Sequence, residues 1–355
     1  MQVVRMNISL PNNSVQCRRD TSVTSVVFPC LYSLLFLCAL VLNSLAAWIF
    51  FKIPSTSTFV VYLKNVVVAD FLMTLTFPIK VLSDAGIGSW QLRVVYCRYS
   101  AVLFYISMYI SIILLGLISL DRYLKIVRPF GKGPLQQVRV GQFLSAGVWV
   151  VMLSLALPNT VLSDRMPLSP GAKFKCTTMK GEAGMAWHEG FTYFVQVVFW
   201  CTFGLMAVCY TFISKKVYES YMASRSSSKA ASRSTKAKVF VVVVVFFICF
   251  GPYHFVRTPY TMTQTKGKTN QCGSNYDQAL YVAKETTLWL SATNVCLDPL
   301  IYIFLCSVFR RRLTATLRRR PLPQDIGESP TATSTQREMS MIVPTNVVSG
   351  SEHNL

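Results

Sequence analysis

Charged residues are scarce in this sequence. Asp, Glu, Lys and Arg make up 14% of its 355 residues, whereas about a quarter of a typical soluble domain is charged. There are 3 histidines, and no glycine-rich phosphate loop, nucleophile elbow or metal-spaced histidine cluster occurs. We therefore predict that the protein is not an enzyme. The 52% of apolar residues excludes a disordered chain. A net charge of +20 usually indicates nucleic-acid binding, but the apolar content fits that poorly and favours a membrane protein without a nucleic-acid partner.

Long runs with few or no charged residues recur along the chain. A helix needs about 20 apolar residues to cross a bilayer, and seven runs meet this need: Val26–Phe51, Thr58–Ile79, Tyr99–Leu120, Val140–Leu162, Gly190–Ser214, Val239–Val256 and Thr286–Phe309. Backbone groups in lipid must hydrogen-bond within their own segment, so each run is predicted to be a helix. The sequence thus predicts an all-α membrane protein, a seven-transmembrane helix bundle over residues 26–306 within the lipid bilayer.

The segments that flank the runs predict the orientation. Lys and Arg are concentrated between the fifth and sixth runs and directly after the seventh. These segments should therefore lie in the cytoplasm, which places the N-terminus outside the plasma membrane. Residues 1–25 would then form an extracellular tail that is glycosylated at the sequons of Asn7 and Asn12.

The segment after the seventh run divides into two parts. Residues 307–320 mix arginines with apolar residues, as expected of a short amphipathic helix on the inner leaflet. Residues 321–355 are rich in serine and threonine without apolar periodicity, which predicts a disordered cytoplasmic tail.

The cysteines outside the runs predict disulfides. Cys17, Cys97, Cys176 and Cys272 fall one in each of the four outer segments, where an oxidising environment permits disulfide bonds. Four cysteines allow three pairings, and the sequence alone does not choose among them. Cys306, at the inner end of the seventh run, is a candidate for palmitoylation, and a plain buried thiol explains it equally well.

Basic residues are unusually frequent on the predicted outer side. The positive electrostatic field of these residues attracts anions. Arg257 and Lys284 lie at the outer ends of their runs, where their side chains can point into the bundle. His254, Arg257 and Tyr260 are spaced by three and form a polar stripe on an apolar helix, which is costly in a membrane and therefore indicates function. Together with Tyr105, these residues suit a flat heteroaromatic ring that carries phosphates, with core packing as the competing explanation for each aromatic side chain.

Two carboxylates are predicted at mid-depth of the bundle. Asp70 lies in the second run and Asp298 in the seventh, and a buried carboxylate must pair, bind a cation or take up a proton. Ser111 and Asn294 could complete an oxygen-rich cage for a sodium ion, with structural polar contacts as the alternative. Apart from this candidate allosteric ion, we expect no cofactor.

Several motifs together resemble those of rhodopsin-like (class A) G-protein-coupled receptors. They comprise Asn43, Asp70, Trp149, Asp121-Arg122-Tyr123, Cys249-Phe250-Gly251-Pro252-Tyr253, Asn294 and Asp298-Pro299-Leu300-Ile301-Tyr302. The resemblance implies a Cys97–Cys176 disulfide, a second disulfide between Cys17 and Cys272, and a tail that receptor kinase and arrestin recognise. It also implies a switch that engages the G protein, formed by Asp121, Arg122, Tyr123, Pro299 and Tyr302.

A narrower resemblance is to the purinergic nucleotide receptors. It rests on residues 59–65, 254–261 and 284–288, and points to the branch that answers ADP or UDP-sugars and lowers cAMP through inhibitory G proteins. The resemblance implies that Arg257 and Lys284 hold the phosphates and that the ring stacks on Tyr105. The further ligand-binding positions that it implies are Asn159, Lys180, His188, Tyr260 and, within the stripe, His254.

The sequence departs from these two patterns at four places. Thr192 stands where ADP-responsive relatives tend to carry an asparagine, and Phe250 replaces the usual tryptophan. The fifth run lacks the usual proline, and no acid near residues 232–236 is available to Arg122, which is expected to rest on Asp121 alone. An orphan or lysophospholipid-responsive receptor of the same fold is therefore the alternative. For a nucleotide we expect phosphate binding to Arg257 and Lys284 to draw the outer ends of the sixth and seventh runs inward, with Pro252 as the pivot.

Overall fold

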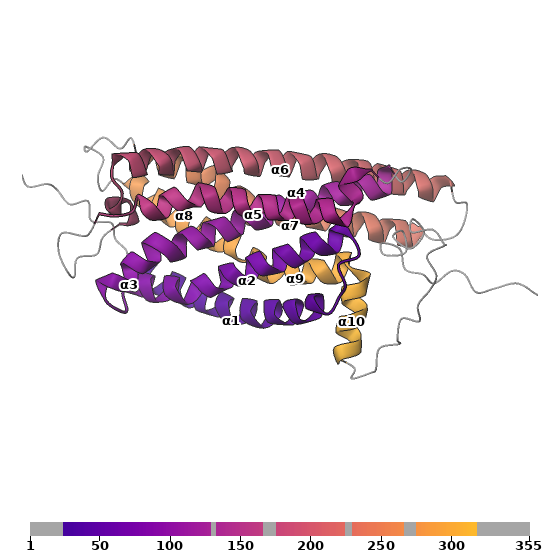
Figure 1. The fold of residues 1–355 in the computed structure, drawn as a ribbon, viewed down its shortest axis with the longest axis horizontal. Coiled ribbons are helices and arrows are strands. Elements are labelled where there is room, and N and C mark those ends of the chain that lie inside the picture. Colours follow the sequence, from indigo (N-terminus) through magenta and orange to yellow (C-terminus); the bar gives the residue numbers. More distant parts are fainter. Residues whose placement is uncertain (1–23, 129–132, 166–174, 224–228, 266–274, 318–355) are drawn as a thin grey trace, which may run out of the picture.

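The structure, a computed structural model, describes residues 24–128, 133–165, 175–223, 229–265 and 275–317, and all regular secondary structure in these ranges is helical (Figure 1). The long helices are α1 (Thr24–Phe51), α2 (Thr58–Ala85), α4 (Ala101–Val127), α5 (Val138–Val161), α6 (Glu182–Ala223), α7 (Lys229–Thr265), α8 (Asn275–Ala292), α9 (Asn294–Leu305) and α10 (Ser307–Leu317). The short ones are α3 (Trp90–Val95), the π-helical η1 (Tyr96–Ser100), and the 3₁₀ helices η2 (Pro134–Gln136) and η3 (Cys176–Met179).

Six stretches of the described chain are long and apolar enough to cross a membrane. A seventh, Asn275–Ile303, is formed by α8 and α9 and passes the same test together with α10, which is bent away from it by 95°. The predicted seven-transmembrane helix bundle is therefore confirmed. The helices α2 and α6 extend beyond the apolar runs, because a helix satisfies its own backbone after it leaves the hydrocarbon region.

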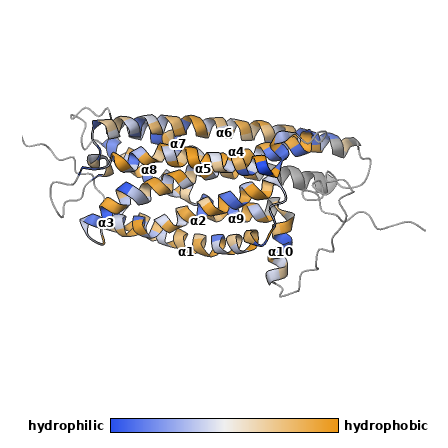
Figure 2. Cartoon of the chain, viewed as in Figure 1, coloured by the Kyte–Doolittle hydropathy of each residue, from blue (hydrophilic) through white to orange (hydrophobic). Residues whose placement is uncertain are grey.

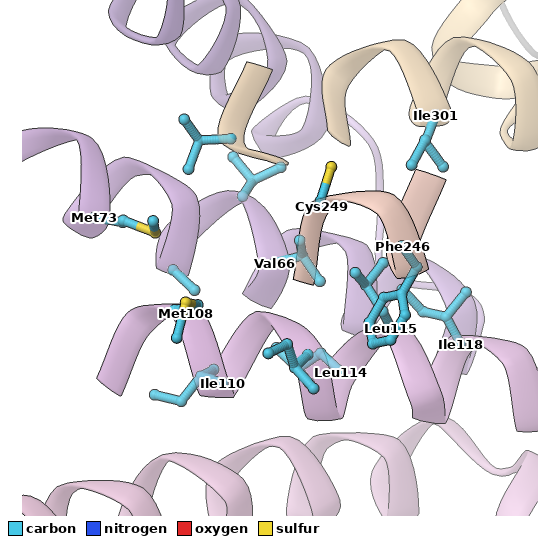
Figure 3. Close-up of a cluster of buried hydrophobic side chains, with 14 of the residues drawn as sticks. Val66, Met73, Met108, Ile110, Leu114, Leu115, Ile118, Phe246, Cys249 and Ile301 are labelled. Atoms are coloured by element: carbon cyan, nitrogen blue, oxygen red, sulfur yellow. The ribbon is translucent and has the colours of Figure 1, made fainter. Parts of the chain in front are cut away.

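The helix α4 occupies the centre of the bundle and packs against α2, α5 and α6. Apolar residues cover the outside of the bundle, among them Leu34, Val41 and Phe143 (Figure 2). An exterior of this kind is stable only against lipid. Inside, the buried side chains of α4 meet residues of α2, α7 and α9 in one core (Figure 3), and they include Met108, Ile110, Leu114, Leu115 and Ile118.

Local sequence features end and redirect the helices. Ser57 caps the first turn of α2 by accepting a hydrogen bond from the backbone N–H of Val60. Gly86 ends α2 with φ of 71°, a left-handed conformation that glycine adopts without a steric penalty. The helix α10 leaves the bundle sideways (Figure 1), anchored by Phe309, which stacks on Phe50 of α1 with ring centroids 4.9 Å apart.

Candidate ligand-binding site

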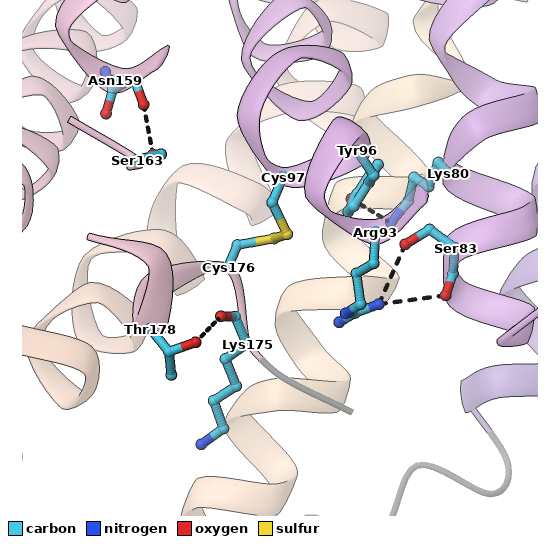
Figure 4. The surroundings of a disulfide bond; sticks show 10 residues. All are labelled: Lys80, Ser83, Arg93, Tyr96, Cys97, Asn159, Ser163, Lys175, Cys176 and Thr178. Atoms are coloured by element: carbon cyan, nitrogen blue, oxygen red, sulfur yellow. Dashed lines mark hydrogen bonds between the residues drawn. A yellow bond between two sulfur atoms is a disulfide. The ribbon is translucent and has the colours of Figure 1, made fainter. Parts of the chain in front are cut away.

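A disulfide holds the loop between α5 and α6 against the bundle. Cys97 of η1 is bonded to Cys176 of η3, with the two Cα atoms 5.2 Å apart (Figure 4), which is the pairing implied by the family resemblance. We call this end of the bundle the disulfide end. Lys180 follows Cys176 by four residues, so the disulfide keeps this ammonium near the outer parts of α5, α6 and α7.

Arg257 is the cation at the centre of the disulfide end. It lies on α7, is 8% exposed, and directs its guanidinium toward α6 and α4. Its Nη2 is 3.4 Å from Nε2 of His188, and its Cζ is 5.4 Å from the ring centroid of Tyr105. No carboxylate of the described residues forms an ion pair with it. An unpaired buried charge is costly, so a ligand anion would be stabilised here.

Lys180 is a second cation without a carboxylate partner in the described part of the chain. Its Nζ donates to the side-chain oxygen of Asn159, at 3.1 Å. Burial and the nearby positive charge of Arg257 lower the pKa of Lys180 to about 8. We call Arg257 and Lys180 the unpaired cations.

Two further lysines at the same end are neutralised by acids. Lys284 forms an ion pair with Glu285, and its Nζ lies 5.2 Å from the ring centroid of Tyr260. Lys80, which is 4% exposed, forms ion pairs with Asp84 at 2.8 Å and with Glu285 at 3.5 Å. We call Lys80 and Lys284 the paired lysines, and their network joins α2 to α8.

Lys80, Asp84 and Glu285 belong to the site but were not predicted from the sequence. Lys80 directly follows the second apolar run, where the pattern indicates the end of the membrane span. The i, i+4 spacing of Lys80 and Asp84 is a signal that could have located their ion pair on one helix face. The contact with Glu285 joins residues that are distant in sequence, and only the fold reveals it.

A small cavity lies between Lys80 and Tyr105. Its wall is formed by α2, η1, α4 and α8, through Thr76, Lys80, Tyr96, Ser100, Ala101, Phe104, Tyr105 and Leu288. Tyr105 lies at the border between this cavity and the unpaired cations, since Arg257 faces its ring. The cavity is polar on the side of Lys80 and Tyr96, where Lys80 Nζ is 3.4 Å from the tyrosine hydroxyl (Figure 4).

The polar stripe of α7 divides into two levels. Arg257 and Tyr260 lie beside the other predicted ligand residues. His254 is fully buried one turn deeper, where its ring stacks on Phe199 of α6 at a centroid distance of 3.7 Å. Its Nδ1 donates to the carbonyl of Phe250 at 2.8 Å. The ring of His254 is therefore held by α6 and by its own helix.

The mid-depth carboxylates lie within one polar cluster. Ser111 donates to Oδ1 of Asp70 at 3.1 Å, and Asn294 donates to Oδ2 of Asp298 at 2.7 Å. The Tyr302 hydroxyl adds a bond to Oδ2 of Asp70 at 3.2 Å. Oδ1 of Asp298 is buried without a hydrogen-bond partner among the described residues. A set of hard oxygen ligands with one unsatisfied carboxylate oxygen fits a small cation.

The predicted G-protein switch lies at the opposite end. Asp121 forms ion pairs with Arg122 and Lys125, both at 3.3 Å, and accepts a hydrogen bond from Thr58. The guanidinium of Arg122 also stacks over the ring of Phe59, 3.7 Å from its centroid. The expectation that Arg122 rests on Asp121 alone was therefore incomplete, because the aromatic contact comes from a different helix. Among the other switch residues, Tyr123 is half-buried against Phe212, whereas Pro299 lies inside α9.

Cys306 is buried in the core, at 1% exposure. A thiol in this position is not accessible to acyl transfer, so the structure favours the buried-thiol interpretation over palmitoylation. The predicted Cys17–Cys272 disulfide, the sequons of Asn7 and Asn12 and the tail at 321–355 lie outside the described residues.

Comparison with known proteins shows the family of this chain. Residues 42–302 match the family described as "7 transmembrane receptor (rhodopsin family)". Purinoceptor 13 of Homo sapiens is 47% identical over 309 residues, covering 87% of this chain and 86% of the relative. Purinoceptor 14 of Bos taurus is 43% identical over 309 residues, covering 87% of this chain and 90% of the relative. G-protein coupled receptor 87 of Mus musculus is 42% identical over 304 residues, covering 85% of this chain and 82% of the relative.

Proposed function

Because this chain belongs to the rhodopsin family of seven-transmembrane receptors and is a purinergic-type, nucleotide-responsive member of it, we propose that its agonist is extracellular ADP, UDP or a UDP-sugar. As a receptor of this family it acts on G proteins and is not an enzyme. Within the proposal, an inhibitory G protein transmits the signal and lowers cAMP. Receptor kinase and arrestin would then act on the tail.

The unpaired cations carry this proposal. Arg257 is buried and Lys180 is half-buried, and burial together with the positive charge of Arg257 lowers the pKa of Lys180. A diphosphate placed between them would supply the missing negative charge. Arginine suits bidentate phosphate contacts, and lysine contributes a point charge. The paired lysines already have Glu285 and Asp84, so we assign them a smaller share of the phosphate binding.

The base is assigned to the aromatic side of the same site. Tyr105 presents its ring beside Arg257, and stacking on a tyrosine accepts any flat heterocycle. The hydroxyl of Thr192 donates to the carbonyl of His188 on its own helix, at 2.8 Å. The Thr192 hydroxyl proton is therefore not available to a base edge, which is consistent with selectivity that is not restricted to adenine.

The disulfide supports the proposed orientation of the chain in the plasma membrane. A bond between Cys97 and Cys176 requires an oxidising compartment, which supports placing the disulfide end outside the plasma membrane. The N-terminus would share that side, since the chain crosses the membrane twice, through α1 and α2, before it reaches Cys97. We also assign a sodium ion to Asp70, Ser111, Asn294 and Asp298 in the resting receptor, because their oxygen atoms suit it.

The proposed mechanism is a shift between two conformations. Phosphate binding would draw the outer parts of α6 and α7 toward the disulfide-held loop, because Arg257 and Lys180 would then share one anion. That contraction would favour a state in which the inner end of α7 moves outward and Arg122 leaves Asp121 for the G protein. The ligand shifts the equilibrium only by its differential affinity for the two states.

The test is a nucleotide panel in a cAMP-inhibition assay. We expect ADP, UDP or a UDP-sugar to act and the corresponding nucleosides to be inactive. Substituting Arg257→Ala should weaken the response by about 100-fold or more, because it removes charge-assisted hydrogen bonds in a buried site. The matched control is Arg93→Gln, since Arg93 lies at the same end but binds the backbone and hydroxyl of Ser83. A response to lysophospholipids alone, or an unchanged dose–response curve for Arg257→Ala at equal surface expression, would refute the assignment.

A further inference from the structure

Pro252, one of two prolines in the membrane-spanning part of α7, lies among backbone carbonyls that accept hydrogen bonds from side chains. Pro252 has no N–H, and its ring displaces the carbonyl four residues earlier, so the helix can bend here. Three carbonyls near this proline accept hydrogen bonds from side chains. The donors are Ser291 to Cys249, His254 to Phe250, and Gln196 to His254.

Two of these three bonds come from neighbouring helices. Gln196 of α6 donates its amide nitrogen to the carbonyl of His254 at 2.8 Å. Ser291 of α8, which is fully buried, lies with its hydroxyl 3.1 Å from the carbonyl of Cys249. These two contacts fix α7 from both sides, one just before Pro252 and one just after it.

The two contacts differ in how readily they can be released. The hydroxyl of Ser291 is also 3.1 Å from the carbonyl of Thr287 on its own helix, so its single proton can return to α8 when α7 moves. Gln196 has no second acceptor of this kind among the described residues, and its Oε1 is already buried without a partner. Opening of the hinge therefore costs little at Ser291 and more at Gln196.

We propose that Gln196 and Ser291 are positioning residues that clamp the Pro252 hinge of α7 in a conformation closed to the G protein. In the conformation described here, Arg122 is 6% exposed, paired with Asp121 and stacked on Phe59. The residue is thus inaccessible to a partner while the clamp is formed. Loss of either clamp bond removes a contact present in the closed conformation, so the ratio of open to closed receptor rises.

The experiment measures ligand-independent nucleotide exchange on purified G-protein trimers that are added to cell membranes containing the receptor. The exchange rate is divided by the amount of receptor at the cell surface. We expect Gln196→Met to raise basal exchange by about 2- to 10-fold, the range that the loss of one net hydrogen bond produces, and Ser291→Ala to raise it by less, because the Ser291 proton can return to the carbonyl of Thr287. The effect of Gln196→Met should be the larger, because its bond has no alternative. Both variants should leave the extrapolated maximal response to agonist unchanged.

Two matched controls remove hydrogen bonds that do not cross between helices. Ser145 is buried and donates only to Gly141 of its own helix, and Thr211 of α6 donates to Ala207. Ser145→Ala and Thr211→Val should keep wild-type basal exchange, although their unfolding temperatures fall. Wild-type exchange in both clamp variants, or an equal rise in the controls, would overturn the proposal. If neither variant reaches the surface, Ser291→Cys is tested in their place. Its thiol is a weaker donor than the hydroxyl, so a smaller rise in basal exchange is expected, and wild-type exchange would overturn the proposal.

Discussion

The disulfide end of the bundle contains two kinds of cation. The paired lysines, Lys80 and Lys284, are neutralised by Asp84 and Glu285 and connect α2 to α8. The unpaired cations, Arg257 and Lys180, contact only neutral partners in the described structure. The first pair links two helices through its ion pairs, and the second is the pair to which we assign anion binding. A lysine and an arginine in similar surroundings can thus serve different purposes, and the presence or absence of a counterion distinguishes them.

The largest expected effect comes from removing the acid that the paired lysines share. Glu285→Gln leaves Lys80 with Asp84 alone and removes the carboxylate that pairs with Lys284, and breaking a buried ion pair costs about 3–5 kcal/mol. We expect a large fall in the unfolding temperature of the purified, ligand-free receptor.

Arg257→Gln provides the contrast to that variant. It removes a buried charge that has no counterion among the described residues, so the ligand-free receptor should unfold at the wild-type temperature or above it. If Arg257→Gln destabilises the empty receptor as strongly as Glu285→Gln does, then Arg257 has a structural partner and the distinction between the two kinds of cation fails.

A smaller effect is expected from Arg257→Lys. The charge is retained, but the planar fork that forms two parallel bonds to a phosphate is lost. We expect the nucleotide dissociation constant to rise about 10-fold, which corresponds to about 1.4 kcal/mol. The same exchange in the other direction, Lys284→Arg, should change affinity little, because Glu285 remains its partner. A competition binding assay with a labelled nucleotide measures both.

The smallest effect is the pH dependence of binding. The pKa of Lys180 in the empty receptor is about 8, so its ammonium is mostly charged at pH 7 and mostly neutral at pH 9. Affinity for the nucleotide should therefore fall as pH rises through 8, by about 10-fold at most between those two values. Lys180→Arg should abolish this dependence while retaining tight binding, and Lys180→Met should abolish it with weak binding. An unchanged pH profile in both variants would exclude Lys180 as its source.

The fold could be predicted from the sequence because a membrane imposes a simple requirement. Each span must be long, apolar and helical, and the seven runs satisfy this without any knowledge of packing. The extension of α2 beyond Ile79 could not be predicted in the same way. Lys80 and Asp84 end the apolar pattern, but they are tolerated there because they neutralise each other on one helix face.

The candidate site could be predicted only in part. Arg257 and Tyr105 can be identified because polar groups on an apolar helix are costly and therefore informative. The three-residue spacing of His254, Arg257 and Tyr260 places them on one face, but it does not show which neighbouring helix each side chain meets. His254 stacks on Phe199, a contact set by tertiary packing alone. The same limitation applies to Arg122, whose aromatic contact joins two helices.

Lys180 lies four residues after the disulfide-bonded Cys176, so the redox state of the medium would affect the proposed phosphate binding. With the two sulfurs joined, the ammonium is held near Arg257, and in the proposed binding mode it would be present there at high effective concentration for a phosphate. With the sulfurs reduced, the same loop would sample many positions, and every binding event would have to overcome that lost order. A thiol-rich environment would thus desensitise the protein to its messenger while its helices remain intact.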